Sequence, residues 1–320
     1  MKIVAEDKPI GGDVKLLRVC LLLMALFPAW HMARSQSNIQ TTIFRHDPSY
    51  TEGNAFFNHA ASVERLPNGE LVAAWSGGLS EAATDSRIFL SRSPDGGQNW
   101  STPIVIVNPP GSALAASPLL FQHTNKLWLI WAWQPDAGAG VNAPMVKSFI
   151  TTSTDGGNNW SESVEIPSNK YRFIGPLFKP EHIDGRLGFA YYWRDQGNPQ
   201  THVGILLASD DLTTWEERGD VFISGRRLLE PVLTREPDGR LILFMRSDLK
   251  DIYSSQSTNA GVSWTSPVPL RVPNPDTLNT VRRLSNGRYL VAWIIIPTIE
   301  TICLWESLPI INFPLSNSTH

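Results

Sequence analysis

Glu230 and Arg246 flank a stretch whose centre, Asp238-Gly239, is a strong signal for a tight hairpin. A guanidinium binds a carboxylate through two parallel hydrogen bonds, a geometry that lysine cannot reproduce. A glutamate and an arginine placed in this way are either an ion pair on a solvated face or part of a site that handles acidic groups.

Other kinds of chemistry are less well supported by the composition. The seven histidines and two cysteines show no close paired spacing, so the sequence predicts no metal site and no cofactor. The formal net charge is −3, with 18% charged residues, which lacks the basic field of a nucleic-acid-binding protein. The 320 residues, 42% of them hydrophobic, suffice for one large globular domain.

The elements that would position such residues are marked by a repeated turn motif, Ser-x-Asp-x-Gly-x-x-Trp. It occurs at Ser93–Trp100 and Ser153–Trp160, with Asn for Asp at Ser257–Trp264, and in a shorter, degenerate form at Ser209–Trp215. Asp or Asn accepts backbone N–H bonds in such turns, Gly supplies a positive φ, and Trp anchors the turn in a neighbouring sheet. We interpret the motif as structural.

Hairpin signals recur between the copies of this motif. They lie at Ser62–Trp75, Leu120–Trp133, His182–Trp193, Val232–Met245 and Val281–Trp293. Each of the first four is followed by one copy of the motif, which gives units of about fifty residues with four short strands each, the pattern of propeller blades. After Trp293 no further copy follows. The sequence therefore predicts an all-β propeller over residues 55–293, with about five blades of a six-bladed ring.

The two ends of the chain differ from the repeats. Residues 19–30 form an apolar run after Lys15 and Arg18, too short for a membrane span and typical of a signal peptide. We predict a signal peptide and leader over residues 1–35, an N-terminal segment over 36–54 and an aberrant or truncated tail over 294–320. The protein is thus expected to be secreted or periplasmic. A buried N-terminal helix is the alternative reading of the apolar run.

The repeated motif resembles the Asp-boxes, or BNR repeats, of sialidases and their relatives. The resemblance covers about residues 55–293 and includes Trp75-Ser76-Gly77-Gly78 before the first Asp-box. It implies a sialidase-type propeller. It also implies that Glu230 supports a tyrosine nucleophile and that Arg246 is one of three arginines that bind the substrate carboxylate.

The resemblance further implies a general acid/base aspartate in the loop that precedes Ile88. We assign it to Asp85 rather than Glu81, because Asp85 directly precedes the strand. A catalytic acid needs a raised pKa, which burial at the mouth of an apolar tunnel can supply. An aspartate that only forms a turn is the alternative.

This sequence departs from the sialidase pattern at two places. Phe57-Asn58-His59-Ala60 stands where sialidases have Arg-Ile-Pro, and the third arginine and the tyrosine would fall after Trp293. His59 could instead serve as a catalytic acid or base near neutral pH. Lys179, Tyr192 and Arg194 lie at equivalent strand ends and could complete a site for an anionic sugar, although each alone is compatible with a structural or solvated role.

Three functions follow as hypotheses. The first is an exo-α-sialidase-like glycoside hydrolase that acts on acidic glycans. The second is another glycosidase, or a polysaccharide lyase, that acts on uronate-containing glycans through His59. The third is a propeller that binds carbohydrate without catalysis.

Overall fold

In the computed structural model, the described residues are 57–80, 83–135, 145–296 and 299–306. These ranges form twenty strands, and they contain no helix that could cross a membrane. The predicted all-β class is confirmed. The predicted signal peptide (1–35) and N-terminal segment (36–54) lie outside the described residues and stay predictions.

The strands form five antiparallel sheets that follow one another in chain order. The first contains β1 (Phe57–Arg65), β2 (Leu71–Gly78), β3 (Arg87–Ser93) and β4 (Ile104–Val107). The second contains β5 (Leu114–His123), β6 (Lys126–Gln134), β7 (Lys147–Ser153) and β8 (Val164–Glu165). The third contains β9 (Arg172–Ile174), β10 (Glu181–Ile183), β11 (Arg186–Arg194), β12 (His202–Ala208) and β13 (Trp215–Val221). The fourth contains β14 (Leu228–Arg235), β15 (Leu241–Ser247), β16 (Asp251–Ser257) and β17 (Val268–Pro273). The fifth contains β18 (Asn279–Arg283), β19 (Tyr289–Ile296) and β20 (Ile299–Glu306), so its pairing continues past the boundary predicted at 293.

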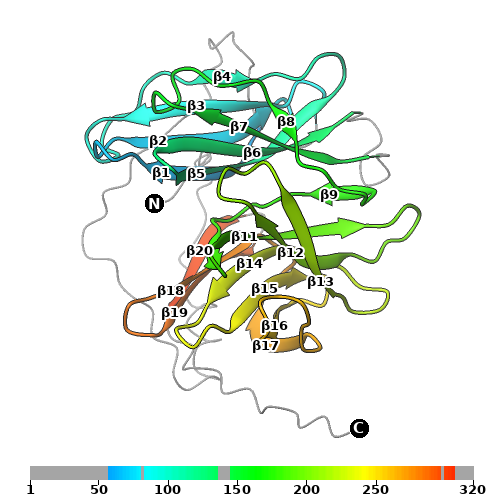
Figure 1. The fold of residues 1–320 in the computed structure, drawn as a ribbon. Coiled ribbons are helices and arrows are strands. Elements are labelled where there is room, and N and C mark those ends of the chain that lie inside the picture. The colour runs from blue at the N-terminus through cyan, green and yellow to red at the C-terminus, as the bar shows by residue number, and fades with distance from the viewer. Residues whose placement is uncertain (1–56, 81–82, 136–144, 297–298, 307–320) are drawn as a thin grey trace, which may run out of the picture.

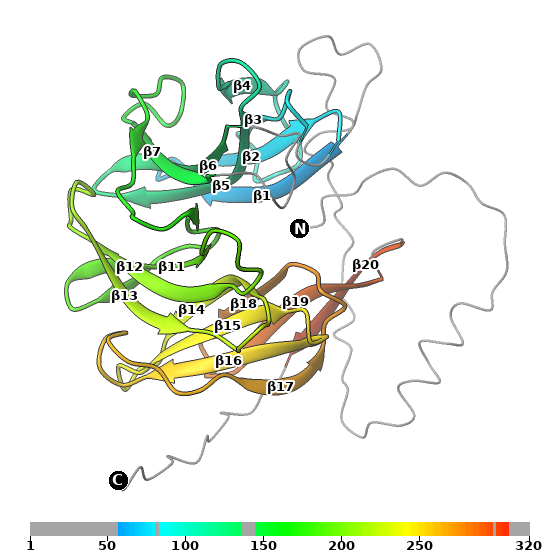
Figure 2. The ribbon, with the colours of Figure 1, turned by 90° about the vertical axis from the view of Figure 1, so that its right-hand side faces the viewer.

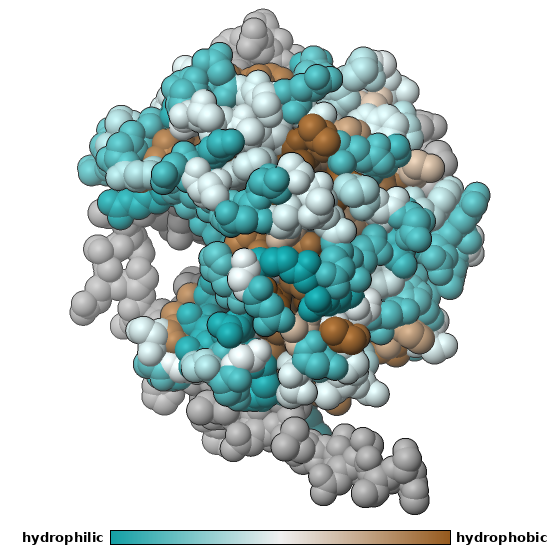
Figure 3. Space-filling view, viewed as in Figure 1, coloured by the Kyte–Doolittle hydropathy of each residue, from teal (hydrophilic) through white to brown (hydrophobic). Residues whose placement is uncertain are grey.

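Each sheet packs against the sheet before it (Figures 1 and 2). Strand β5 contacts the first sheet, β9 contacts β7, β14 contacts the third sheet and β18 contacts the fourth. Four apolar clusters accordingly lie between consecutive sheets and combine side chains from both. The face seen in Figure 3 is mainly polar, with apolar side chains in separate patches. This arrangement is that of a propeller, as the repeats predict.

The five predicted hairpins are confirmed as β1–β2, β5–β6, β10–β11, β14–β15 and β18–β19. Their turns use the positive φ that the sequence signals indicate. Gly239, for example, has a φ of 90°, and Thr124 and Asn125 have φ values of 49° and 61°. The turns between the first two strands therefore lie at one end of every sheet. The opposite end of each sheet is formed by the start of its first strand and the end of its second.

The Asp-boxes join the last two strands of a sheet at this same end. In the first box, Asp95 accepts hydrogen bonds from the backbone N–H of Asn99 at 2.9 Å and from its side chain at 2.6 Å. These bonds, together with that from the Ser93 hydroxyl, lower the pKa of Asp95 to about 2. The Ser93 hydroxyl also accepts the N–H of Gly97, and the Trp100 indole donates to the Gly97 carbonyl. Each box is thus closed by its own side chains.

The boxes also attach one sheet to the next. Trp160 packs in the cluster between the first and second sheets, and Trp264 packs in the cluster between the third and fourth. Arginines add polar contacts across the same boundaries: Arg92 donates to the Gly156 carbonyl, and Arg218 donates to the Ala260 carbonyl at 3.1 Å. A box therefore orients its sheet relative to the preceding one.

The third box shows that two of its positions are coupled. In the second box, the Asp155 carboxylate accepts the side-chain amide of Asn159 at 2.7 Å. In the third box, Asn259 donates its own amide to the Ser263 hydroxyl at 2.8 Å. We expect Asp155→Asn alone to lower Tm by a few degrees, because two amide NH₂ groups would then face each other. The double variant Asp155→Asn/Asn159→Ser should recover most of this loss. Thermal unfolding monitored by circular dichroism measures both, and equal Tm values for the single and double variants would contradict the coupling.

Candidate functional site

The first strands of three sheets share a bulge with one residue in the left-handed region. These residues are Ala60, Ser117 and Glu230, with φ values of 54°, 56° and 49°, and each lies where the register shifts. A left-handed conformation is uncommon for a residue other than Gly, and bulges of this kind re-aim a side chain. In the fourth sheet the re-aimed side chain is a carboxylate, Glu230.

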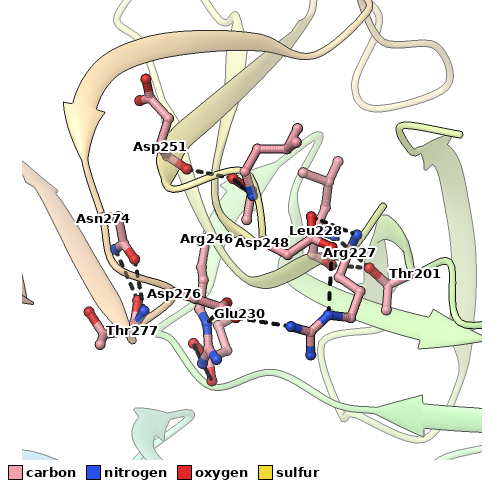
Figure 4. A network of polar contacts seen from close by, with 12 residues as sticks. Thr201, Arg227, Leu228, Glu230, Arg246, Asp248, Asp251, Asn274, Asp276 and Thr277 are labelled. Atoms are coloured by element: carbon pink, nitrogen blue, oxygen red, sulfur yellow. Dashed lines mark hydrogen bonds and ion pairs between the residues drawn. The ribbon is translucent and has the colours of Figure 1, made fainter. Parts of the chain in front are cut away.

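The Glu230 carboxylate is held by Arg246 (Figure 4). Both of its oxygens lie 2.9 Å from Nη1 of Arg246, and Nε of Arg246 lies 2.8 Å from Asp276. Asp276 is also in the left-handed region, with a φ of 70°. The side chains of Glu230, Arg246 and Asp276 are only 13%, 20% and 16% exposed. Backbone strain of this kind is typical of functional sites, where the surrounding structure must maintain it.

Opposite charges are in contact within this group, which holds one more carboxylate than guanidinium groups. Burial by itself lowers the pKa of Arg246, but the charge of Glu230 and the hydrogen bonds to Asp276 and Glu230 raise it overall. Arg227 extends the network, since its guanidinium lies 2.9 Å from Asp276 and 3.8 Å from Asp248. We call these five residues the blade-four network. It lies where β14 begins and β15 ends, at the opposite end of the sheet from the Asp-box.

The third sheet adds two of the predicted residues to this neighbourhood. Tyr192 and Arg194 lie at the end of β11, where Arg194 is the register partner of Arg172. Burial and the charge of Glu230 raise the pKa of Tyr192, while Arg246, Arg172 and Arg194 lower it. The hydroxyl of Tyr192 is therefore within electrostatic reach of the blade-four network. Tyr192 packs against the apolar cluster between the third and fourth sheets, and Arg194 lies two residues further along the same strand. The roles of Tyr192 and Arg194 in a site stay predictions.

The remaining predicted residues have their own surroundings. His59 is exposed on β1, where it is the register partner of Ser76 and its ring lies 5.7 Å from that of Phe57. Asp85 accepts the backbone N–H of Leu79 at 3.1 Å, which closes the loop between β2 and β3. Glu81, the alternative to Asp85, lies outside the described residues. The catalytic roles of His59 and Asp85 stay predictions.

Lys179 lies in the loop between β9 and β10, and this loop contacts two other sheets. Lys179 forms a 2.8 Å ion pair with Glu64 of β1, and Phe178 packs on the cluster between the fourth and fifth sheets. We call residues 175–180 the crossing loop. The role of Lys179 in substrate binding stays a prediction, and its described contact joins the third sheet to the first.

Four residues of this region were not predicted from the sequence: Arg172, Arg227, Asp248 and Asp276. Asn274-Pro275-Asp276 reads as a turn, so the sequence offered a signal for the local structure of Asp276 but none for its partner. Arg172 belongs to a strand of three residues, too short for a periodic pattern. Among the described residues, no group of three or more His, Cys, Asp or Glu is arranged to hold a metal ion.

Similar proteins point to one superfamily. A curated sialidase of Paraclostridium sordellii is 24% identical over 254 residues, which cover 70% of this chain and 61% of that protein. Among solved structures, the Hadza microbial sialidase Hz136 has a TM-score of 0.64 at 19% identity and covers 80% of this chain and 57% of its own. The intramolecular trans-sialidase from Ruminococcus gnavus has a TM-score of 0.61 at 14% identity, over 86% of this chain and 89% of its own. At these identities, the structural likeness shows the fold.

The chain spans about three fifths of the length of the curated sialidase that it matches. The profile of the BNR repeat-like domain matches residues 69–295, which is most of the chain and contains the last four hairpin turns and the Asp-boxes. The chain therefore belongs to the BNR repeat-like family, within the sialidase superfamily.

Proposed function

We propose that this protein is an exo-α-sialidase-like glycoside hydrolase that removes a terminal acidic sugar from a glycan. The observation that carries the proposal is Glu230, a carboxylate held at a left-handed bulge by Arg246 and placed within electrostatic reach of Tyr192. A carboxylate that a guanidinium orients in this way is suited to accept a proton. The similar proteins named above, two sialidases and one intramolecular trans-sialidase, support the choice of a reaction at a sialic acid glycoside.

In this proposal, each group has a separate task. Glu230 accepts the proton of the nucleophile, a tyrosine hydroxyl by the resemblance, as its oxygen bonds to the anomeric carbon. Asp85 donates a proton to the glycosidic oxygen as the bond from that oxygen to the anomeric carbon breaks, and water then releases the sugar from the tyrosine. Arg246 and Asp276 fix the position of Glu230, because the guanidinium of Arg246 lies between the two carboxylates. Binding of the substrate carboxylate by Arg246 itself, which the resemblance implies, would require it to exchange one of these partners.

Hydrolysis of a fluorogenic α-sialoside tests the proposal. We expect release of the fluorophore from the methylumbelliferyl α-glycoside of N-acetylneuraminic acid and none from the matching galactoside. Near-ultraviolet circular dichroism would show that the sample is folded, since Trp75, Trp131 and Trp193 are all buried in the sheets. A folded sample that turns over neither substrate would refute the hydrolase assignment.

His59 favours a second candidate, a lyase or glycosidase that acts on uronate-containing polymers. His59 is exposed and directly precedes Ala60, which has a left-handed backbone conformation. The bulge at Ala60 in the first sheet is equivalent to the bulge at Glu230 in the fourth sheet. The ultraviolet absorbance of unsaturated products would report lyase activity, and His59→Ala should abolish it. An unchanged rate in this variant would argue against a role for His59.

A further inference from the structure

An open cavity lies between the third and fourth sheets at their Asp-box end. Its volume is about 640 Å³, which is in the size range of small-molecule binding sites. The β10–β11 turn, strand β13, the β14–β15 turn and the third Asp-box form its walls, and three of its lining residues are arginines: Arg218, Arg235 and Arg240. A guanidinium binds an oxyanion through parallel hydrogen bonds, so this lining suits a ligand with acidic groups.

The cavity is separate from the candidate functional site. Glu230 and Arg235 belong to the same strand, β14, and lie toward its opposite ends. At about 3.3 Å per residue, the steps between them span roughly 17 Å. One sugar unit therefore cannot contact both places, and the cavity calls for a separate ligand or for a distant part of a long one.

Two of the arginines are held in position by bonds within the fold. Nε of Arg218 donates to Glu216 at 2.6 Å, and its Nη1 donates to a backbone carbonyl of the third Asp-box at 3.1 Å. Nε of Arg240 donates to Asp238 at 2.8 Å, and its Nη1 donates to Gln256 at 2.9 Å. These bonds use Nε and Nη1 of both side chains, which leaves Nη2 of each to meet a ligand. The two guanidinium groups are thus oriented before any ligand binds.

Arg235 supplies the third guanidinium from above the hairpin turn of the fourth sheet. The residue is exposed, and its Nη2 lies 3.9 Å from the place that a Cβ on Gly239 would take. Glu181 of β10 is within electrostatic reach of Arg235, but it does not line the cavity. Since Arg218 belongs to the third sheet, the cavity receives positive charge from both of its sides.

The Asp-box that borders the cavity is the one that carries Asn in place of Asp. Asn259 lines the cavity, and its amide donates to the Ser263 hydroxyl at 2.8 Å. At the equivalent position of the first box, the backbone N–H and side chain of Asn99 lower the pKa of Asp95 to about 2. An aspartate at this position would therefore be ionised at neutral pH, and the neutral Asn259 keeps a negative charge away from the three arginines.

The other lining groups suit a carbohydrate chain. Asp184 is exposed at the β10–β11 turn, where its carboxylate can accept sugar hydroxyls. Val262 is 61% exposed and offers apolar surface to the C–H face of a sugar ring. Because the arginines come from two sheets, a ligand that contacts all of them must carry more than one acidic group.

We propose that this cavity binds a segment of an acidic polysaccharide, whose carboxylate or sulfate groups contact Arg218, Arg235 and Arg240. The cavity takes no part in bond cleavage, so the inference does not depend on the proposed hydrolase activity. The protein as a whole has a formal net charge of −3 and would repel a polyanion, so binding must arise from this local arrangement.

Isothermal titration calorimetry with defined chains tests the site. The probes are dextran sulfate, with dextran as its uncharged match, and polygalacturonate, with its methyl ester. We expect binding of at least one acidic chain and of neither neutral chain. Arg235→Gln should weaken this binding about fivefold, the upper value for one exposed charge pair, and Arg235→Glu should weaken it further because it reverses the charge.

Asn259→Asp tests the same site without removal of an arginine. It should weaken binding of the acidic chain by a similar factor, because it adds a negative charge at the cavity wall. The variant should fold, since the first and second boxes carry Asp95 and Asp155 at this position. Neither Asn259→Asp nor Arg235→Gln should change the hydrolysis of a small fluorogenic sialoside, because both residues lie outside the blade-four network.

The matched control is Arg226→Gln. Arg226 is also exposed, but it lies in the loop between β13 and β14, at the other end of the same two sheets. This variant loses the same charge as Arg235→Gln and should bind the acidic chain as the wild type does.

Each outcome decides for or against the site. No binding of either acidic chain, equal binding of acidic and neutral chains, wild-type affinity in Arg235→Glu and Asn259→Asp, or an equal loss in Arg226→Gln would overturn the inference. Equal binding of single-stranded DNA would overturn the assignment to a polysaccharide. Binding of only one acidic chain would support the site and identify its acidic group. Binding without sialoside hydrolysis would also support it, and only the proposed function would then fail.

Discussion

Glu230→Gln is expected to lower kcat for sialoside hydrolysis by about 10²- to 10⁴-fold, the range for loss of a general base. Glutamine has nearly the same shape, so it can keep one hydrogen bond to Arg246, and Asp276 still holds that guanidinium at 2.8 Å. It cannot accept a proton at neutral pH, however. Because Glu230 is expected to act in the chemical step, KM should change much less than kcat. Steady-state kinetics with the fluorogenic sialoside measures both.

Glu236→Gln provides the matched control. Glu236 is at the other end of the same hairpin, where it accepts the Tyr289 hydroxyl and lies 3.4 Å from Arg283. Like Glu230, Glu236 is a poorly exposed glutamate close to an arginine. Its replacement should therefore lower stability and leave kcat near the wild-type value. Equal losses of kcat in the two variants would mean that Glu230 contributes through stability alone.

Gly219→Ala is expected to destabilise the protein by about 3 kcal/mol or more, the largest stability effect that we predict. Gly219 has a φ of 80°, and an added Cβ would overlap the indole of Trp264 in the third Asp-box and lie 3.1 Å from the Gly261 carbonyl. Trp264 belongs to the fourth sheet and packs on the third, so the substitution pushes these two sheets apart. Urea unfolding monitored by tryptophan fluorescence measures the change.

Gly197→Ala separates strain from the clash. Gly197 has a similar φ of 74°, but nothing lies within 4 Å of the added Cβ. Its replacement should therefore cost only the left-handed conformation, about 1–2 kcal/mol. If Gly219→Ala costs no more than Gly197→Ala, Trp264 does not hold the two sheets as described. Gly219→Ala should also reduce turnover, because the third and fourth sheets supply opposite sides of the candidate site.

The fold could be predicted from the sequence because its main signals are local. Turn residues such as Asn68-Gly69 and the Asp-box around Asp95 act over a few positions, and their hydrogen bonds form within that span. Repetition then carries this local information through the chain. The chemistry of the hairpin around Gly239 was also local enough to bring Glu230 and Arg246 together.

The rest of the site depends on information that is not local. The left-handed φ of Glu230 follows from a bulge that its sequence neighbours do not signal. The turn at Asn274-Pro275-Asp276 is visible in the sequence, but it does not indicate that Asp276 contacts Arg246. Arg172 reaches Arg194 only because residues 172–174 pair with β11 before β10 does. The Lys179 contact with Glu64 joins sheets that are not neighbours in the chain. Each of these depends on tertiary packing, which no spacing rule encodes.

The crossing loop bears on how such a repeat protein unfolds. In an array whose units contact only their neighbours, stability is a sum of unit and nearest-neighbour interface terms, and the ends can fray one unit at a time. The crossing loop adds a contact between the first and third sheets through Lys179 and one with the fourth–fifth cluster through Phe178. Unfolding of the first sheet would therefore also destabilise the third sheet, which is two units away in the chain. The stability of the sheets is thus not a sum of nearest-neighbour terms, and they unfold more nearly as one cooperative unit.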